Sequence, residues 1–279
     1  MPRMDGIEFI RRLLPQYPLP VIVVSTVSSR VFDALKAGAV DFMTKPDVSS
    51  VINVENFINE MIMKIKIAAT ANIHIKPGFS SRKIIGGTNM DSDMIIAIGA
   101  STGGTVAIYE ILRHLPRSTP GIVVAQHIPP VFSRMFAERL NNEIDLEVRE
   151  ARTGDFIEKG LVLIAPGDKH LRIKRIGGKY RVECFESAKV NGHCPSVDIL
   201  FESVAKEAGS KAIGIILTGM GCDGAKGLLS MRKMGARTIG QDEESSVVYG
   251  MPKVAYNIGA IEKQASLQQI PHLIFSMLS

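Results

Sequence analysis

The sequence predicts an α/β fold: a doubly wound, mostly parallel sheet of the Rossmann-like type that carries an antiparallel β insertion. Short apolar runs recur along the chain, and amphipathic stretches separate them. The composition, 46% hydrophobic and 22% charged, is typical of a globular protein. The runs are continuous, as expected for strands that are buried on both faces of a parallel sheet. They read VIVVS, MIIAIG, GIVVAQ, GLVLIAP and AIGIILTG.

The first 66 residues alternate helix and strand but supply only two strands. Helices are expected over 5–18, 29–39 and 54–71, and strands over 20–25 and 40–46. Two parallel strands do not make a stable open sheet. We therefore interpret residues 1–66 as the C-terminal half of a partial, flavodoxin-like domain. Residues 67–92 are rich in Gly, Pro, Ser and Lys and are expected to form a linker.

Residues 93–279 are predicted to form the second and larger domain. Strands are expected over 94–99, 121–127, 212–219 and 236–242, and helices over 106–115, 132–143, 196–209 and 225–235, before a closing helical stretch. Residues 161–186 read as a β-meander, which would be the antiparallel insertion. Ligands of such folds bind at the carboxyl ends of the parallel strands.

Charge and cysteine content exclude several classes of protein. The net charge of +5 comes from scattered Lys and Arg, without a basic run or a patch interleaved with aromatic residues, so no nucleic-acid partner is expected. Three cysteines without a CxxC pair argue against a disulfide framework and a structural metal site, and they fit the cytoplasm. No run approaches the roughly 20 apolar residues that span a bilayer, so no membrane insertion is expected, and the pattern calls for no cofactor.

The turn after the strand at 94–99 matches G-x-S-x-G, with Ser101 at its centre. Such a strand-to-helix turn lifts a serine hydroxyl clear of the backbone, where it can act as a nucleophile. A helix N-terminus behind a glycine turn also binds anions through its free N–H groups. The turn lacks G-x-G-x-x-G and the lysine of a P-loop, so the phosphate-binding alternative is the weaker one but stays open at this point.

A serine nucleophile needs a base and a carboxylate that orients it. His127 ends the strand at 121–127, which places it on the same sheet edge as Ser101. Asp223 follows the glycines that end the strand at 212–219; its alternative role is to cap the helix that starts just after it. The loop residues His170 and His193 could also reach this edge. Three strand-end residues of the right types predict a Ser101–His127–Asp223 triad.

Five long blocks carry a family resemblance: IGASTGGTVAI, VVAQHIPPVFSRMFAERL, VLIAPGDKHL, GHCPSVDILFESVA and IILTGMGCDGAKGLLSMRKMGARTIGQDEESSVVYGMPKVA. Together they resemble the chemotaxis protein-glutamate methylesterases and glutamine deamidases of the CheB type. The resemblance implies that Ser101, His127 and Asp223 are the catalytic residues. It also implies oxyanion or substrate-site roles for Thr102, His193 and Met220. The implied substrates are glutamate γ-methyl esters, and particular glutamines, on methyl-accepting chemotaxis receptors.

The N-terminal segment resembles the second half of a response-regulator receiver domain. Ser25 stands at the switch hydroxyl position and Lys45 at the position of the lysine that contacts phosphate. The phospho-accepting aspartate of such domains would lie before Met1. The chemotaxis histidine kinase is therefore expected as a partner only if the receiver were complete.

These observations predict a cytoplasmic serine hydrolase of the chemotaxis adaptation system. Two alternatives belong to other classes: a non-catalytic phosphate- or nucleotide-binding module, and an inactive remnant that acts through protein contacts.

Overall fold

The computed structural model describes residues 4–26, 28–46, 51–73 and 93–278. The chain divides into two compact units, Met1–Gly78 and Phe79–Ser279.

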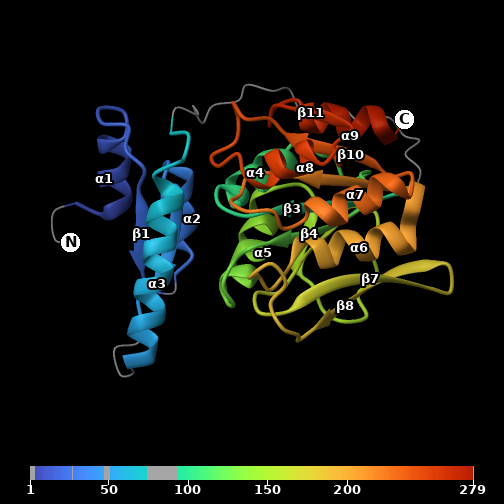
Figure 1. Ribbon diagram of the computed structural model, residues 1–279, viewed down its shortest axis with the longest axis horizontal. Coiled ribbons are helices and arrows are strands. Elements are labelled where there is room, and N and C mark those ends of the chain that lie inside the picture. The colour runs from blue at the N-terminus through green and yellow to red at the C-terminus, as the bar shows by residue number, and fades with distance from the viewer. Residues whose placement is uncertain (1–3, 27, 47–50, 74–92, 279) are drawn as a thin grey trace. The chain divides into compact units, whose positions relative to one another are not determined.

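The described residues of unit 1 form two parallel strands and three helices in alternation (Figure 1). The strands pair in register from Ile22 opposite Asp41 to Ser25 opposite Thr44. The predicted alternation is confirmed. The first two helices and both strands are shorter than the hydrophobic pattern indicated, and the third helix begins and ends three residues earlier. They are α1 (Gly6–Leu13), β1 (Ile22–Ser25), α2 (Arg30–Lys36), β2 (Asp41–Thr44) and α3 (Val51–Ala68).

Unit 2 is built on a seven-stranded sheet in the order β11-β10-β9-β3-β4-β6-β5, in which every pair is parallel. Every residue of β3, β4, β6 and β9 is buried, which accounts for their unbroken apolar sequences. The strands are β3 (Ile95–Ala100), β4 (Gly121–Gln126), β5 (Glu147–Glu150), β6 (Leu161–Ile164), β9 (Ala212–Ile216), β10 (Arg237–Gln241) and β11 (Lys263–Ala265).

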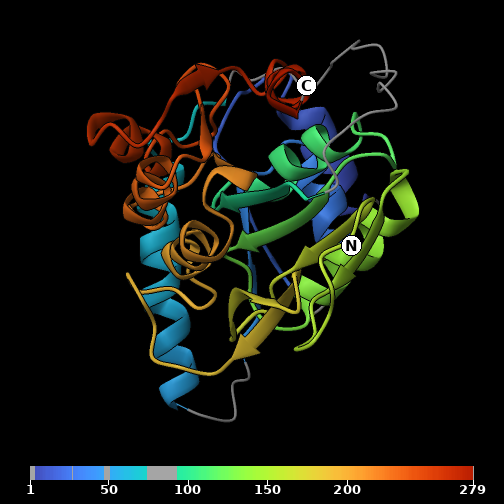
Figure 2. The ribbon, with the colours of Figure 1, turned by 90° about the vertical axis from the view of Figure 1, so that its right-hand side faces the viewer.

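The helices of unit 2 cover both faces of this sheet. Helices α6, α7 and α8 contact one another in sequence on one face, and α4 and α5 lie on the other (Figure 2). The chain moves from β3 through α4 to β4 in one direction and from β9 through α7 to β10 in the other. Right-handed crossovers then place α4 and α7 on opposite faces, so β3 and β9 flank the topological switch point. The helices are α4 (Gly104–Leu112), α5 (Phe132–Glu143), α6 (Val197–Ala208), α7 (Ala225–Lys233), α8 (Met251–Asn257) and α9 (Ile270–Leu278).

The predicted β-meander over 161–186 is wrong in its first part. Strand β6 pairs in parallel with β4 and β5 inside the main sheet, and only the strands after it are antiparallel. The reason is local: Pro166 and Gly167 interrupt the run after β6, and Asp168 adopts a positive φ of 75°. The antiparallel insertion is a two-stranded hairpin, β7 (His170–Ile176) and β8 (Lys179–Phe185).

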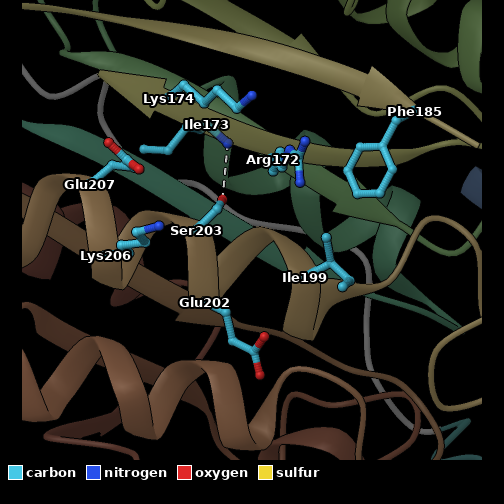
Figure 3. A pocket seen from close by; sticks show the side chains of 9 residues that line it. All are labelled: Arg172, Ile173, Lys174, Phe185, Ile199, Glu202, Ser203, Lys206 and Glu207. Carbon is cyan, nitrogen blue, oxygen red and sulfur yellow. Dashed lines mark hydrogen bonds between the residues drawn. The ribbon is translucent and has the colours of Figure 1, made fainter. Parts of the chain in front are cut away.

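The hairpin is hydrogen-bonded to α6 along the edge of β7 that does not pair with β8 (Figure 3). The hydroxyl of Ser203 accepts a hydrogen bond from the Ile173 amide at 2.9 Å, and a carboxylate oxygen of Glu207 accepts one from the Arg175 amide at 3.1 Å. These side chains stand one helical turn apart on α6, and the amides they bind alternate along β7. The two bonds give hydrogen-bond acceptors to backbone N–H groups at the edge of β7, where a third strand would otherwise supply them.

Among the described residues, no helix is both long and apolar enough to cross a membrane.

Candidate active site

Ser101 and His127 leave the sheet side by side at the switch point. Ala100 of β3 pairs with Gln126 of β4, and the His127 amide donates to the Ala100 carbonyl at 3.0 Å. The side-chain nitrogen Nε2 of Gln126 donates to the backbone carbonyls of both Ser101 and His127, each at 2.9 Å. Because Gln126 is buried, this one side chain fixes the backbone of both residues.

The turn that carries Ser101 depends on two glycines. Gly103 has a positive φ of 79°, and a Cβ there would meet the Val247 side chain at 2.7 Å. A Cβ on Gly104 would meet the Gln126 side-chain oxygen at 2.2 Å. The backbone can therefore follow this tight path only without side chains at the two positions. Ser101 is held from both sides, because its amide donates to the Thr218 carbonyl at 3.0 Å and its carbonyl accepts from the Gly104 amide at 2.7 Å.

Asp223 is 1% exposed and accepts hydrogen bonds from several donors. Its oxygens accept from the backbone amides of Val197 (2.7 Å) and Asp198 (3.2 Å) and from the Ser196 hydroxyl (2.8 Å). Asp223 therefore caps the first turn of α6. The local alternative, a cap on the helix that follows it, is wrong, since Gly224 is the N-cap residue of α7.

His127 donates from Nε2 to Asp223 Oδ2 at 2.8 Å, and its side chain is 8% exposed. Burial alone would raise the pKa of Asp223. Hydrogen bonds, first from His127 and then from Asn191, more than offset this and hold the pKa well below its usual range. With Asp223 ionised, Nε2 carries the ring proton. Nδ1 has no partner in the described part of the chain, so it keeps a lone pair that can accept a proton.

His193 stacks on His127, with ring centroids 3.6 Å apart and planes 8° from parallel. A tight turn places it there: Val190 and His193 exchange backbone hydrogen bonds, and Asn191 (φ 52°) and Gly192 (φ 84°) form the corner. Burial and the neighbouring His127 lower the pKa of His193 to about 4. His193 is therefore neutral at pH 7.

The end of β9 lies against the serine turn. A Cβ on Gly219 would come within 2.6 Å of the Ser101 Cβ, and Met220 follows directly, with 45% of its side chain exposed. The Met220 amide donates no hydrogen bond within the described ranges. Thr102 is buried, and its carbonyl accepts from the Thr218 hydroxyl at 3.0 Å. The structure thus brings the sequence-predicted residues of unit 2 to one edge of the sheet.

Of His170 and His193, which were both expected in loops, only His193 belongs to this cluster, and His170 is instead the first residue of β7. His170 is fully buried, and its ring accepts from the Ser196 amide at 3.2 Å and hydrogen-bonds the Ala188 carbonyl at 3.0 Å. Its role is to hold the loop before α6.

The two receiver positions also lie together, in unit 1. Ser25 ends β1 beside Thr44 of β2, and the Lys45 amide donates to the Ser25 carbonyl at 2.8 Å.

Sequence reasoning missed Asn191, Ser196 and Gln126. Asn-Gly is the typical signature of a two-residue hairpin turn, and a serine before VDIL is a helix N-cap signature, so two of these had a local signal. Gln126 had none, since its partners on the Ser101 turn lie 25 residues away in the chain.

A doubly wound parallel sheet with a serine, a histidine and a buried aspartate at its switch point is the arrangement of an α/β serine hydrolase. The chain belongs to the CheB methylesterase family, whose sequence profile matches residues 96–274. The predicted family resemblance is confirmed.

Two relatives and one solved structure define the similarity. The protein-glutamate methylesterase/protein-glutamine glutaminase 2 of Syntrophomonas wolfei is 55% identical over 279 residues, which are 100% of this chain and 82% of that protein. The corresponding protein of Salmonella typhi is 43% identical over 284 residues, covering 100% and 81%. The crystal structure of the Thermotoga maritima CheB methylesterase catalytic domain matches with a TM-score of 0.65 and 38% identity, over 66% of this chain and 98% of that one.

Proposed function

We propose that this protein is a serine hydrolase that demethylates glutamate γ-methyl esters, and deamidates particular glutamines, on methyl-accepting chemotaxis receptors. The observation that carries the proposal is the hydrogen bond between His127 and buried Asp223, beside the glycine turn that carries Ser101. The names of the relatives, protein-glutamate methylesterase/protein-glutamine glutaminase, support the choice of substrate.

In this mechanism, Nδ1 of His127 accepts the hydroxyl proton of Ser101 as its oxygen attacks the ester carbonyl. Asp223 stays ionised and stabilises the imidazolium through Nε2. The tetrahedral intermediate collapses, the C–O bond to the methoxy group breaks, and methanol leaves with the proton from His127; an amide substrate releases ammonia. A water molecule, deprotonated by His127, then hydrolyses the acyl-enzyme and regenerates Ser101.

The developing oxyanion needs N–H donors that are already in place. The Met220 amide suits this role, because it donates no hydrogen bond within the described ranges and the preceding Gly219 borders Ser101. The turn before α4, at Thr102, is assigned to the same role; the Gly104 amide itself already donates to the Ser101 carbonyl. The anion-binding property of the glycine turn thus has a use within the esterase mechanism. His193 stacks on the His127 ring and is assigned to the substrate site.

The test is Ser101→Ala, assayed by methanol release from methylated receptor in membranes. We expect a loss of about 10³-fold or more, because the nucleophile is gone while the buried neighbours keep the fold. The matched control is Ser276→Ala, which removes a hydroxyl on α9 that donates to the Leu273 carbonyl. Methanol release at the unmodified rate by the Ser101 variant would contradict the proposal.

The two alternatives predict different results in the same assays. A phosphate-binding module would be stabilised against heat by inorganic phosphate and would not react with serine-directed acylating reagents. An inactive remnant would bind receptor without turnover.

A further inference from the structure

A second buried carboxylate, Asp198, lies beside Asp223, and no step of the proposed reaction uses it. Asp198 is 5% exposed and stands in the first turn of α6, where its own amide donates to Asp223 Oδ1. Burial raises the pKa of Asp198, and the charge of Asp223 raises it further. Two buried carboxylates this close repel each other, so one of them takes up a proton unless donors compensate the charge.

Asn191 supplies that compensation. Its Nδ2 atom donates to Asp198 Oδ2 at 2.8 Å and to Asp223 Oδ1 at 2.8 Å. A primary amide nitrogen carries two hydrogens, one for each carboxylate, whereas the amide oxygen in the same place would face two acceptors. The left-handed backbone of Asn191, closed by the Val190–His193 bonds, aims the amide inward.

We propose that Asn191 is a positioning residue for the hydrolysis. Its amide holds Asp198 and Asp223 ionised side by side and so fixes the charge and orientation of the carboxylate that faces His127. This inference rests on the proposed function, since it assigns a role within that triad.

Several donors to the two carboxylates do not involve residue 191. The Ser196 hydroxyl and the backbone amides of α6 still donate to Asp223, and the Gly227 amide still donates to Asp198 at 2.7 Å. The titratable and charged groups that act on this cluster are His127 from β4, His193 and Lys189 from the turn, Asp198 and Glu202 from α6 and Lys226 from α7.

The test is the pH dependence of kcat/KM for Asn191→Ala. Without the amide, the carboxylate pair either takes up a proton at higher pH or places more uncompensated negative charge beside His127, which favours the imidazolium. Both changes remove the base as the pH falls. We expect the acid limb to rise by about one pH unit, so that activity at pH 6 falls about tenfold more than activity at pH 8.

Two further substitutions at position 191 should displace the acid limb by different amounts. Asn191→Asp adds a third carboxylate and should raise the acid limb further than Ala does. Asn191→Ser keeps one O–H donor and should displace the acid limb less than Ala does. If the Ala variant fails to fold, the Ser variant is measured in its place. In an Asp198→Asn background the displacement caused by Asn191→Ala should shrink, because the second charge is absent.

The profile is measured on p-nitrophenyl acetate and, separately, by methanol release from methylated receptor. An unchanged acid limb, with activity lowered equally at all pH values or not at all, would overturn the role of Asn191 and leave it a structural residue. Absence of methanol release by the unmodified protein would instead contradict the proposed substrate, and the small ester would still test Asn191.

Discussion

The carboxylate of Asp223 binds both the N-terminal turn of α6 and the ring of His127. Its oxygens cap the first turn of α6 and also accept the Nε2–H of His127. Hydrogen bonds from His127 and Asn191 contribute most to keeping this nearly inaccessible carboxylate ionised, and the backbone amides of α6 add to them, because charge-assisted bonds offset its desolvation. The helix and the proposed catalytic pair are therefore coupled: a substitution that moves α6 also moves the group that orients His127.

His193 leads to a prediction about stability. Its pKa in the folded protein is about 4, below its ordinary value of 6.5, so below pH 6.5 the unfolded chain takes up a proton that the folded chain refuses. The folded state thus loses stability from this group as the pH falls from about 6.5 to 4. Above pH 6.5 the group has no such effect.

The variant His193→Phe keeps a ring that can stack on His127 but cannot titrate. Urea unfolding at pH 7.5 and pH 5 should show a smaller loss of stability in this variant than in the unmodified protein, by about 2 kcal/mol. The pKa of buried His114 is also lowered by burial, but both proteins contain it and its contribution cancels. Equal losses in the two proteins would contradict the lowered pKa.

The juxtaposition of the three proposed triad residues could be predicted from the order of the strands. Ser101 and His127 directly follow β3 and β4, Asp223 lies in the loop after β9, and parallel strands end at one edge of a sheet. The supporting residues could not be found this way. Gln126 and Asn191 act on partners 25 and 32 residues away, and their hydrogen bonds depend on how loops meet rather than on local pattern.

At the scale of elements, the buried strands were predictable and the edge strands were not. Strands β3, β4 and β9 are buried on both faces, and their residues are apolar or glycine except Gln126 at the end of β4. Strands β5 and β11 lie at the two edges of the sheet, have four and three residues, and include exposed charged side chains. An edge strand is paired on one side and is partly exposed, so its sequence need not show a hydrophobic pattern.

The hydrogen bond between Ser203 of α6 and Ile173 of β7 leads to a prediction about the stability of the hairpin (Figure 3). Ser203→Ala removes the acceptor for the Ile173 amide, whose residue is 1% exposed. A buried N–H left without an acceptor costs about 1–3 kcal/mol, so the urea midpoint should fall and the Ile173 amide should exchange hydrogen faster.

The control for this prediction is Ser230→Ala, whose hydroxyl donates to the Lys226 carbonyl one turn earlier on α7. That change should stay within about 0.5 kcal/mol, as surface substitutions usually do. Equal effects of the two substitutions would show that the Ser203 contact does not hold the hairpin.

At the scale of the whole molecule, the two units differ in how completely each builds a core. Unit 2 has a seven-stranded sheet with helices on both faces, whereas the part of unit 1 that the structure describes has two strands. Several large apolar side chains of unit 1 are at least 45% exposed within the structure: Phe9, Ile58, Ile62, Met63 and Ile65. We propose that residues 93–279 form an independent catalytic domain and that the first 66 residues form part of a receiver-like one.

This proposal predicts how fragments of the chain behave. Residues 93–279 alone should unfold in one cooperative transition and should hydrolyse p-nitrophenyl acetate at close to the rate of the full chain, because the candidate site and its supporting bonds all lie within unit 2. Residues 1–73 alone should show no cooperative transition, since a two-stranded sheet is at best marginally stable. Circular dichroism during heating, with sedimentation to record association, checks both fragments. A monomeric 1–73 fragment with a sharp transition would contradict the incomplete-domain interpretation, and an unfolded 93–279 fragment would show that unit 2 needs unit 1 to fold.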